Sequence, residues 1–260
     1  MQIDWTRCAQ PQRDHYDTHV LTYLDTRAGW VKHQPPPGAV VLADTIQVTQ
    51  PINPHQLSGP YQQTQEWANA QTPFLINWPE GYHALQHYLD EFWTWHHGPA
   101  GKGCSSGHMM IDPAVPRHLI YVTSTDLQGC AQGIYHETGH LRLESFGLYI
   151  EHHDGRLLKN AASELFDSSV RKDCKRPMSA VLHGVYAWLM FTENDYHTYL
   201  FNHNTSELHQ YALHNIVKIE EGCKEIQRHA RWTTEGTAFV DGVFQWADDL
   251  CARVMKTVSH

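Results

Sequence analysis

Apolar side chains recur at three- and four-residue intervals along two stretches of the N-terminal half. Within residues 13–27, this spacing predicts an amphipathic opening helix. A second run, from residue 79 to about residue 97, predicts a helix with an aromatic face made of Tyr82, Leu85, Tyr88, Leu89, Phe92 and Trp93. Between them, the prolines of QPPPG at 34–38 interrupt regular structure, and residues 39–60 predict one short strand and loops.

Strand-forming residues dominate two short runs in the middle of the chain. HMMID at 108–112 and HLIYVTS at 118–124 are separated by a turn with prolines, which predicts a hairpin. Thr125-Asp126 can then cap a helix over about 127–148. Apolar stripes of helical period predict three further helices, over 178–201, 206–229 and 234–256.

Together these elements predict an α+β fold. We expect a predominantly helical single domain over residues 1–260, with a small β-sheet packed on the helix at 127–148. The chain is long enough to bury a sizeable core. Within the domain, residues 1–100 form a part made of helices and loops, and residues 105–260 contain the hairpin and most of the helices.

Composition and charge exclude several classes of protein. The formal net charge of −9 argues against a nucleic-acid partner, because such proteins concentrate Lys and Arg. Neither a long apolar run nor a secretory signal is found, so we expect no membrane partner. The 6 cysteines include no CxxC pair, which favours a cytoplasmic location over a disulfide framework.

Histidine is abundant, with 21 in the chain, and two of them form a motif with chemical meaning. His136-Glu137-Thr138-Gly139-His140 places two histidines four residues apart. On a helix, this spacing presents both imidazoles to a single metal ion, as in the HExxH helix of zincins. Glu137, beside the first histidine, is in the position of a general base that acts on a metal-bound water. Residues 105–260 are therefore the expected metal-binding part.

Two residues compete to be the third ligand of this ion. Glu164 follows His140 at the separation that many zinc peptidases of this type use for a glutamate. His183 lies among apolar residues at 181–186, where a histidine is either a satisfied core residue or a ligand. The residues alone leave this choice open.

Two segments resemble a known family. The family's HExxH region is similar to residues 136–150, HETGHLRLESFGLYI. Its Arg-Pro and Leu-His-Gly region is similar to residues 168–189, SSVRKDCKRPMSAVLHGVYAWL. The family is that of the HExxH-motif peptide-modification proteins. These are also called 2-oxoglutarate-dependent HExxH-type peptide β-hydroxylases, and they tailor ribosomally made peptide natural products in bacteria. With the residues between them, the two segments span residues 136–189, about a fifth of the chain, and the first hundred residues show no such resemblance.

This resemblance implies an enzyme that uses Fe(II), 2-oxoglutarate and O2 to hydroxylate the β-carbon of a residue in a precursor peptide. It implies that His136, His140 and His183 hold the iron. A three-histidine set departs from the usual two-histidine, one-carboxylate triad, so Glu164 stays open as a ligand. An arginine suits the distal carboxylate of 2-oxoglutarate, and Arg176 is the first candidate, followed by Arg171. Glu137 would then orient ligands or bind substrate.

Two other functions compete with this one. A zinc metallopeptidase would hold Zn(II), with Glu137 as general base and Glu164 as third ligand. A binding protein without catalysis would recognise a leader peptide through a sheet edge. The intact HExxH motif favours an enzyme over the binding protein.

Overall fold

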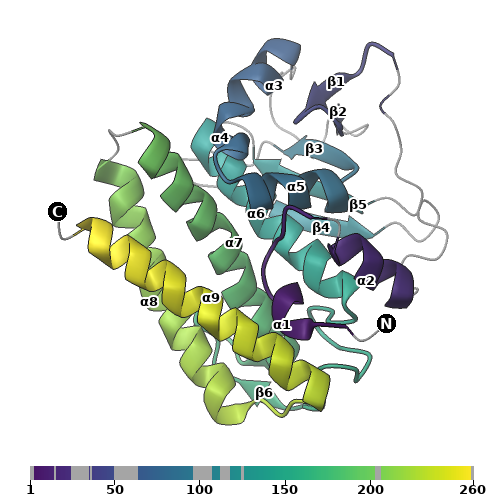
Figure 1. Ribbon diagram of the computed structural model, residues 1–260, viewed down its shortest axis with the longest axis vertical. Coiled ribbons are helices and arrows are strands. Elements are labelled where there is room, and N and C mark those ends of the chain that lie inside the picture. The colour runs from purple at the N-terminus through teal and green to yellow at the C-terminus, as the bar shows by residue number, and fades with distance from the viewer. Residues whose placement is uncertain are drawn as a thin grey trace.

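The computed structural model describes residues 3–14, 16–24, 35, 37–49, 64–95, 107–111, 118–123, 126–202 and 206–258. Its helices lie mostly on either side of a central helix, α6 (Figure 1). The described helices are α1 (Trp5–Cys8), α2 (Tyr16–Leu24), α3 (Gln65–Gln71), α4 (Pro73–Ile76), α5 (Pro79–Tyr88), α6 (Leu127–Ser145), α7 (Met178–Asn202), α8 (Ser206–His229) and α9 (Thr234–Val258). The described strands are β1 (Val40–Leu42), β2 (Ile46–Thr49), β3 (Glu91–Trp95), β4 (Gly107–Ile111), β5 (His118–Thr123), β6 (Leu165–Phe166) and β7 (Arg176–Pro177).

A mixed five-stranded sheet lies on one side of α6. Its strand order is β1-β2-β3-β5-β4, with β3 parallel to both of its neighbours and β4 antiparallel to β5. Strands β4 and β5 pack against α6. The predicted hairpin and the predicted sheet on the HExxH helix are therefore confirmed.

The central helix α6 begins where the sequence indicates. The carboxylate of Asp126 accepts a hydrogen bond from the backbone amide of Gly129, which caps the first turn. Most residues of α6 are buried, because the sheet covers one side and α7 covers another. A helix enclosed in this way is stabilised by packing on several faces rather than by one apolar stripe.

The long helices α7, α8 and α9 pack on one another on the side of the molecule opposite the sheet (Figure 1). Their ranges confirm the three helices predicted from the apolar stripes. One hydrophobic core contains residues from α1 through α9, which agrees with a predominantly helical α+β domain. The second, two-stranded sheet joins β6 to β7 in the connection that leads into α7.

Two predictions in the N-terminal half were wrong. The helix predicted over 79–97 ends at Tyr88, and Leu89 is already extended. Residues 91–95 instead form β3, a central strand between β2 and β5. The sequence EFWTW is rich in residues that favour strands, so parallel pairing on both sides outweighs the helical spacing of its aromatic residues. Within the predicted loop region, residues 40–49 form two paired strands rather than one, and residues 51–60 lie outside the described part of the chain.

A buried ion pair joins the N-terminal part to α6. The fully buried guanidinium of Arg142 donates hydrogen bonds to both carboxylate oxygens of Asp17 on α2. It also donates to the hydroxyl of Tyr186 on α7 and to the backbone carbonyl of Gln10. The hydroxyl of Tyr88 donates to Asp17 as well. This network fixes α2, α5 and α7 around the C-terminal half of α6.

Among the described helices, none is both long enough and apolar enough to cross a membrane. Five cysteines within the described ranges are free, namely Cys8, Cys130, Cys174, Cys223 and Cys251.

Candidate metal centre

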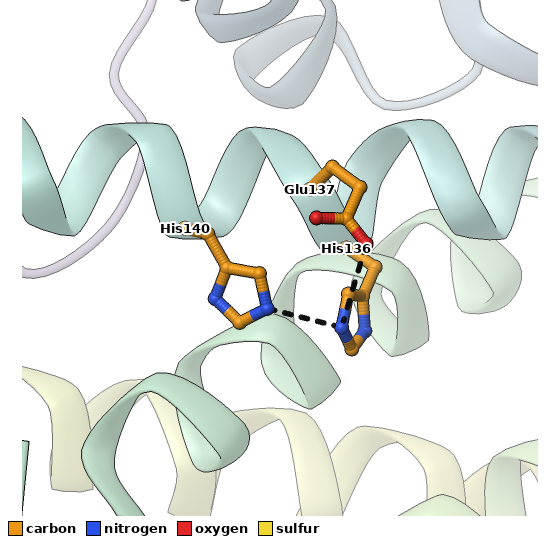
Figure 2. A group of neighbouring side chains, drawn as sticks. All are labelled: His136, Glu137 and His140. Carbon is orange, nitrogen blue, oxygen red and sulfur yellow. Dashed lines mark hydrogen bonds and ion pairs between the residues drawn. The ribbon is translucent and has the colours of Figure 1, made fainter. Parts of the chain in front are cut away.

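Two imidazoles and a carboxyl group gather on the middle of α6. Figure 2 shows the rings of His136 and His140 on the same side of the helix, with the carboxyl group of Glu137 beside His136. The ligand atoms of these three residues all lie within 4.8 Å of one another. Of the residues that the structure describes, these three form the group that could hold a metal ion.

Contacts with α7 fix this face of α6. Gln132 donates to Asp195, the ring of His136 stacks on Phe191, and His140 contacts His183. The α6 partners are spaced one turn apart, and their α7 partners follow in the reverse order, so the two helices run antiparallel. Gly139 permits this approach, because a Cβ there would lie 3.0 Å from Met190 Cγ and 3.4 Å from the Cα of Ala187.

The spacing of the two imidazoles fits a metal ion. The Nε2 atoms of His136 and His140 are 3.1 Å apart. Two nitrogens that each lie about 2.1 Å from one ion are about 3.0 Å apart at a right angle and about 3.4 Å apart at a tetrahedral angle. The observed distance falls between these values. Carboxylate oxygen and imidazole nitrogen suit several transition metals, including Fe(II) and Zn(II).

The protonation state of His136 also suits metal binding. Burial lowers the pKa of His136 to about 4, although part of its ring remains accessible. A neutral imidazole is the form that binds metals, so His136 is ready for this role at neutral pH. Burial raises the pKa of Glu137 to about 8, and its Oε1 lies 4.0 Å from Nε2 of His136. To bind an ion, the carboxyl group of Glu137 would have to release its proton, because carboxylate ligands bind in their deprotonated form.

His183 lies next to this group, as the sequence anticipated. Its Nδ1 is 3.0 Å from Nδ1 of His140, and its Nε2 is 2.8 Å from the backbone carbonyl of Leu148. The pKa of His183 is lowered to about 4, mainly by burial. The hydrogen bond to Leu148 opposes this shift, and the positive charge of Arg176 adds to it. The structure thus brings together His136, Glu137, His140 and His183.

Glu164, the rival third ligand, is held elsewhere. Its carboxylate accepts hydrogen bonds from the side chains of Arg231 at 2.5 Å and Asn160 at 3.1 Å. These bonds lower the pKa of Glu164. Both of its oxygens are therefore already engaged by groups outside the HExxH helix.

The two candidate arginines differ in their surroundings. Arg176 lies in β7, just before α7, where its half-buried side chain pairs with Glu151 and its charge acts on His183. Arg171 is exposed and donates two hydrogen bonds, each 2.8 Å long, to Asp173. Of the two, Arg176 is the one whose charge lowers the pKa of His183.

Three features of this centre were not predicted from the sequence. Phe191 stacks on His136, the Leu148 carbonyl binds His183, and Glu151 pairs with Arg176. Phe191 had a signal in its spacing, because it lies two turns after His183 on one face of a helix. The other two depend on the path of the loop between α6 and α7.

A cavity of about 660 Å³ lies apart from this centre. It is found between the N-terminal helices and the start of α9, and its lining comprises Ile3, Trp5, Tyr23, Leu24, Arg156, Thr234, Glu235 and Ala238. None of the histidines of the candidate centre contributes to it.

Comparison with known proteins adds no assignment. No protein-family model matches the chain, and no curated protein matches it significantly.

Proposed function

We propose that this protein is an iron- and 2-oxoglutarate-dependent oxygenase that hydroxylates the β-carbon of a residue in a ribosomally made precursor peptide. The observation that carries the proposal is the donor set on α6, which consists of two imidazoles and one carboxyl group. Non-haem Fe(II) oxygenases use two histidines and one carboxylate and keep open positions for their substrates. The resemblance of residues 136–150 and 168–189 to peptide β-hydroxylases supports the same chemistry.

In this proposal, His136, His140 and Glu137 hold the iron. When bound, Fe(II) and 2-oxoglutarate supply the activation of O2; the net reaction converts a C–H bond to C–OH and releases succinate and CO2. The Oε1 atom of Glu137 lies 4.0 Å from Nε2 of His136, so the carboxyl group would approach the imidazoles more closely when it joins them on the ion. Phe191 covers one face of His136 and provides an apolar surface beside the reacting groups.

Arg176 is the residue that would bind the distal carboxylate of 2-oxoglutarate. Its guanidinium can form a bidentate pair with a carboxylate, and its half-buried position strengthens such a pair relative to one in open solvent. Glu151 now occupies this guanidinium, and the incoming carboxylate would replace it. The exposed Arg171 is already paired with Asp173 and serves as a matched control.

The scattered cysteines fit an enzyme that works in a reducing cytoplasm. Its partners would be the precursor peptide and O2, with no nucleic acid, since the net charge is −9.

Anaerobic titration of the metal-stripped protein with Fe(II) and 2-oxoglutarate tests this function. A weak visible charge-transfer band forms when 2-oxoglutarate chelates iron. We expect the band in the wild type and in Arg171→Ala, weaker binding of 2-oxoglutarate in Arg176→Ala, and no band in His136→Ala. A wild-type protein that binds Fe(II) without forming the band would refute the proposal.

A zinc metallopeptidase is the second candidate, and the buried Glu137 beside His136 favours it. Such an enzyme would use Glu137 as a general base rather than as a ligand. Glu164, the third ligand expected for this function, accepts hydrogen bonds from Arg231 and Asn160 instead, which counts against it.

Glu137→Gln separates the two functions. A peptidase variant would keep its metal and lose the ability to produce new peptide termini. An oxygenase that uses Glu137 as a ligand would instead lose affinity for Fe(II), and the wild type would add one oxygen to its peptide in step with succinate release.

A further inference from the structure

The three imidazoles of the centre lie in a row rather than around one point. His140 occupies the middle, with its Nε2 atom 3.1 Å from His136 and its Nδ1 atom 3.0 Å from His183. These two nitrogens are on different sides of the His140 ring. The contact with His136 and the contact with His183 are therefore made in different directions.

Hydrogen-bonding rules determine which nitrogens in this row carry protons. The carbonyl of Leu148 can only accept, so the Nε2 atom of His183 must donate to it. A neutral His183 then has an unprotonated Nδ1 atom, which can only accept. The Nδ1 atom of His140 must therefore carry the proton of their shared hydrogen bond. The Nε2 atom of His140 is left with its lone pair, and this lone pair points toward His136.

We infer that His183 is a positioning residue: with the Leu148 carbonyl behind it, it holds His140 in the tautomer and orientation that present Nε2 to the metal. This role rests on the metal centre proposed above. Metal-binding histidines commonly donate their second ring N–H to such a partner, which fixes the ring and makes the metal-binding nitrogen more basic.

The geometry favours this role over direct coordination by His183. Neighbouring ligands of one ion have donor atoms about 3.0–3.4 Å apart, as the Nε2 atoms of His136 and His140 do. The Nδ1 atom of His183 instead faces the nitrogen of His140 that points away from His136. In the described part of the chain, the group of mutually close ligand atoms contains His136, Glu137 and His140 and does not extend to His183.

Substitutions at position 183 separate a positioning residue from a ligand. Glutamine can reproduce both hydrogen bonds, because its amide oxygen accepts from His140 and its NH2 group donates to Leu148. Alanine reproduces neither. Val185→Ala, which truncates a buried side chain on the same helix without changing an imidazole, is the control for loss of packing.

Co(II) titration of the full-length, metal-stripped protein provides the readout. We expect one Co(II) per chain in every variant. Its affinity should be about 10- to 100-fold weaker in His183→Ala and close to that of the wild type in His183→Gln and Val185→Ala. X-ray absorption should count two imidazoles on the ion in both the wild type and His183→Ala.

Two results would overturn the role of His183 while leaving the metal centre intact: three imidazoles in the wild type that fall to two in His183→Ala, or equal losses of affinity in the glutamine and alanine variants. Failure of the wild type to bind Co(II) would instead overturn the metal centre itself.

Discussion

The buried pair between Arg142 and Asp17 makes a sharp prediction about stability. Asp17→Asn keeps the shape of the side chain and one acceptor but removes the charge that faces a fully buried guanidinium. Removing one partner of a buried ion pair costs about 3–5 kcal/mol, because the other charge stays buried without compensation. Asparagine retains an acceptor, and Tyr186 and Gln10 still accept from Arg142. We therefore expect the free energy of unfolding to fall by about 3 kcal/mol.

Urea unfolding, followed by circular dichroism, measures this loss. Asp14→Asn is the matched control, because its pair with Arg7 is exposed and should contribute about 0–1 kcal/mol. If the carboxylates of Asp17 and Asp14 belong to equivalent surface pairs, the free energy of unfolding will fall by the same small amount in both variants. A loss below about 1 kcal/mol in Asp17→Asn would refute the reasoning.

Three further predictions concern the candidate site and the helix α7. Glu151→Gln should tighten 2-oxoglutarate binding by about two- to fivefold, because it frees Arg176 from a surface pair worth about 0.5–1 kcal/mol; a titration that finds no change contradicts this. Burial alone would raise the pKa of Glu193, but hydrogen bonds and the charge of a neighbouring arginine lower it to about 2 from 4.5. Its contribution to stability is therefore complete above pH 4.5 and is lost as the pH falls toward 2. Between pH 6 and pH 3, the free energy of unfolding should fall by about 2 kcal/mol more in the wild type than in Glu193→Gln, and urea unfolding measures this difference. Gly139→Ala should weaken Co(II) binding despite its higher helix propensity, because the new Cβ would press on Met190 and disturb the packing of α6 on α7; unchanged affinity would contradict this.

Much of the fold could be predicted from local patterns. The four long helices have sustained apolar periods or a clear cap at Asp126, and the hairpin has two strand-forming runs around a proline turn. Residues 91–95 could not be assigned this way, because their aromatic residues fit a helical period equally well. What makes them a strand is pairing with β2 and β5, which lie more than forty residues before and about twenty-five residues after them.

Some contacts of the candidate site could likewise be predicted from the sequence, and others could not. The spacing of His136 and His140 on a helix places both rings on one face, so their proximity could be read from the sequence. The partner of His183 could not, because a backbone carbonyl has no residue-specific signature and its position depends on the loop between α6 and α7. The engagement of Glu164 by Arg231, 67 residues away, is likewise a tertiary contact.

The most direct test of the metal centre is the stoichiometry of Fe(II) binding under anaerobic conditions, measured by equilibrium dialysis on the wild type, His136→Ala and a remote histidine control, His229→Ala. We predict one Fe(II) per chain in the wild type and in His229→Ala, and none in His136→Ala at the same free concentration. Equal binding by all three proteins, or no binding by the wild type, would contradict the assignment of His136 and His140 as metal ligands.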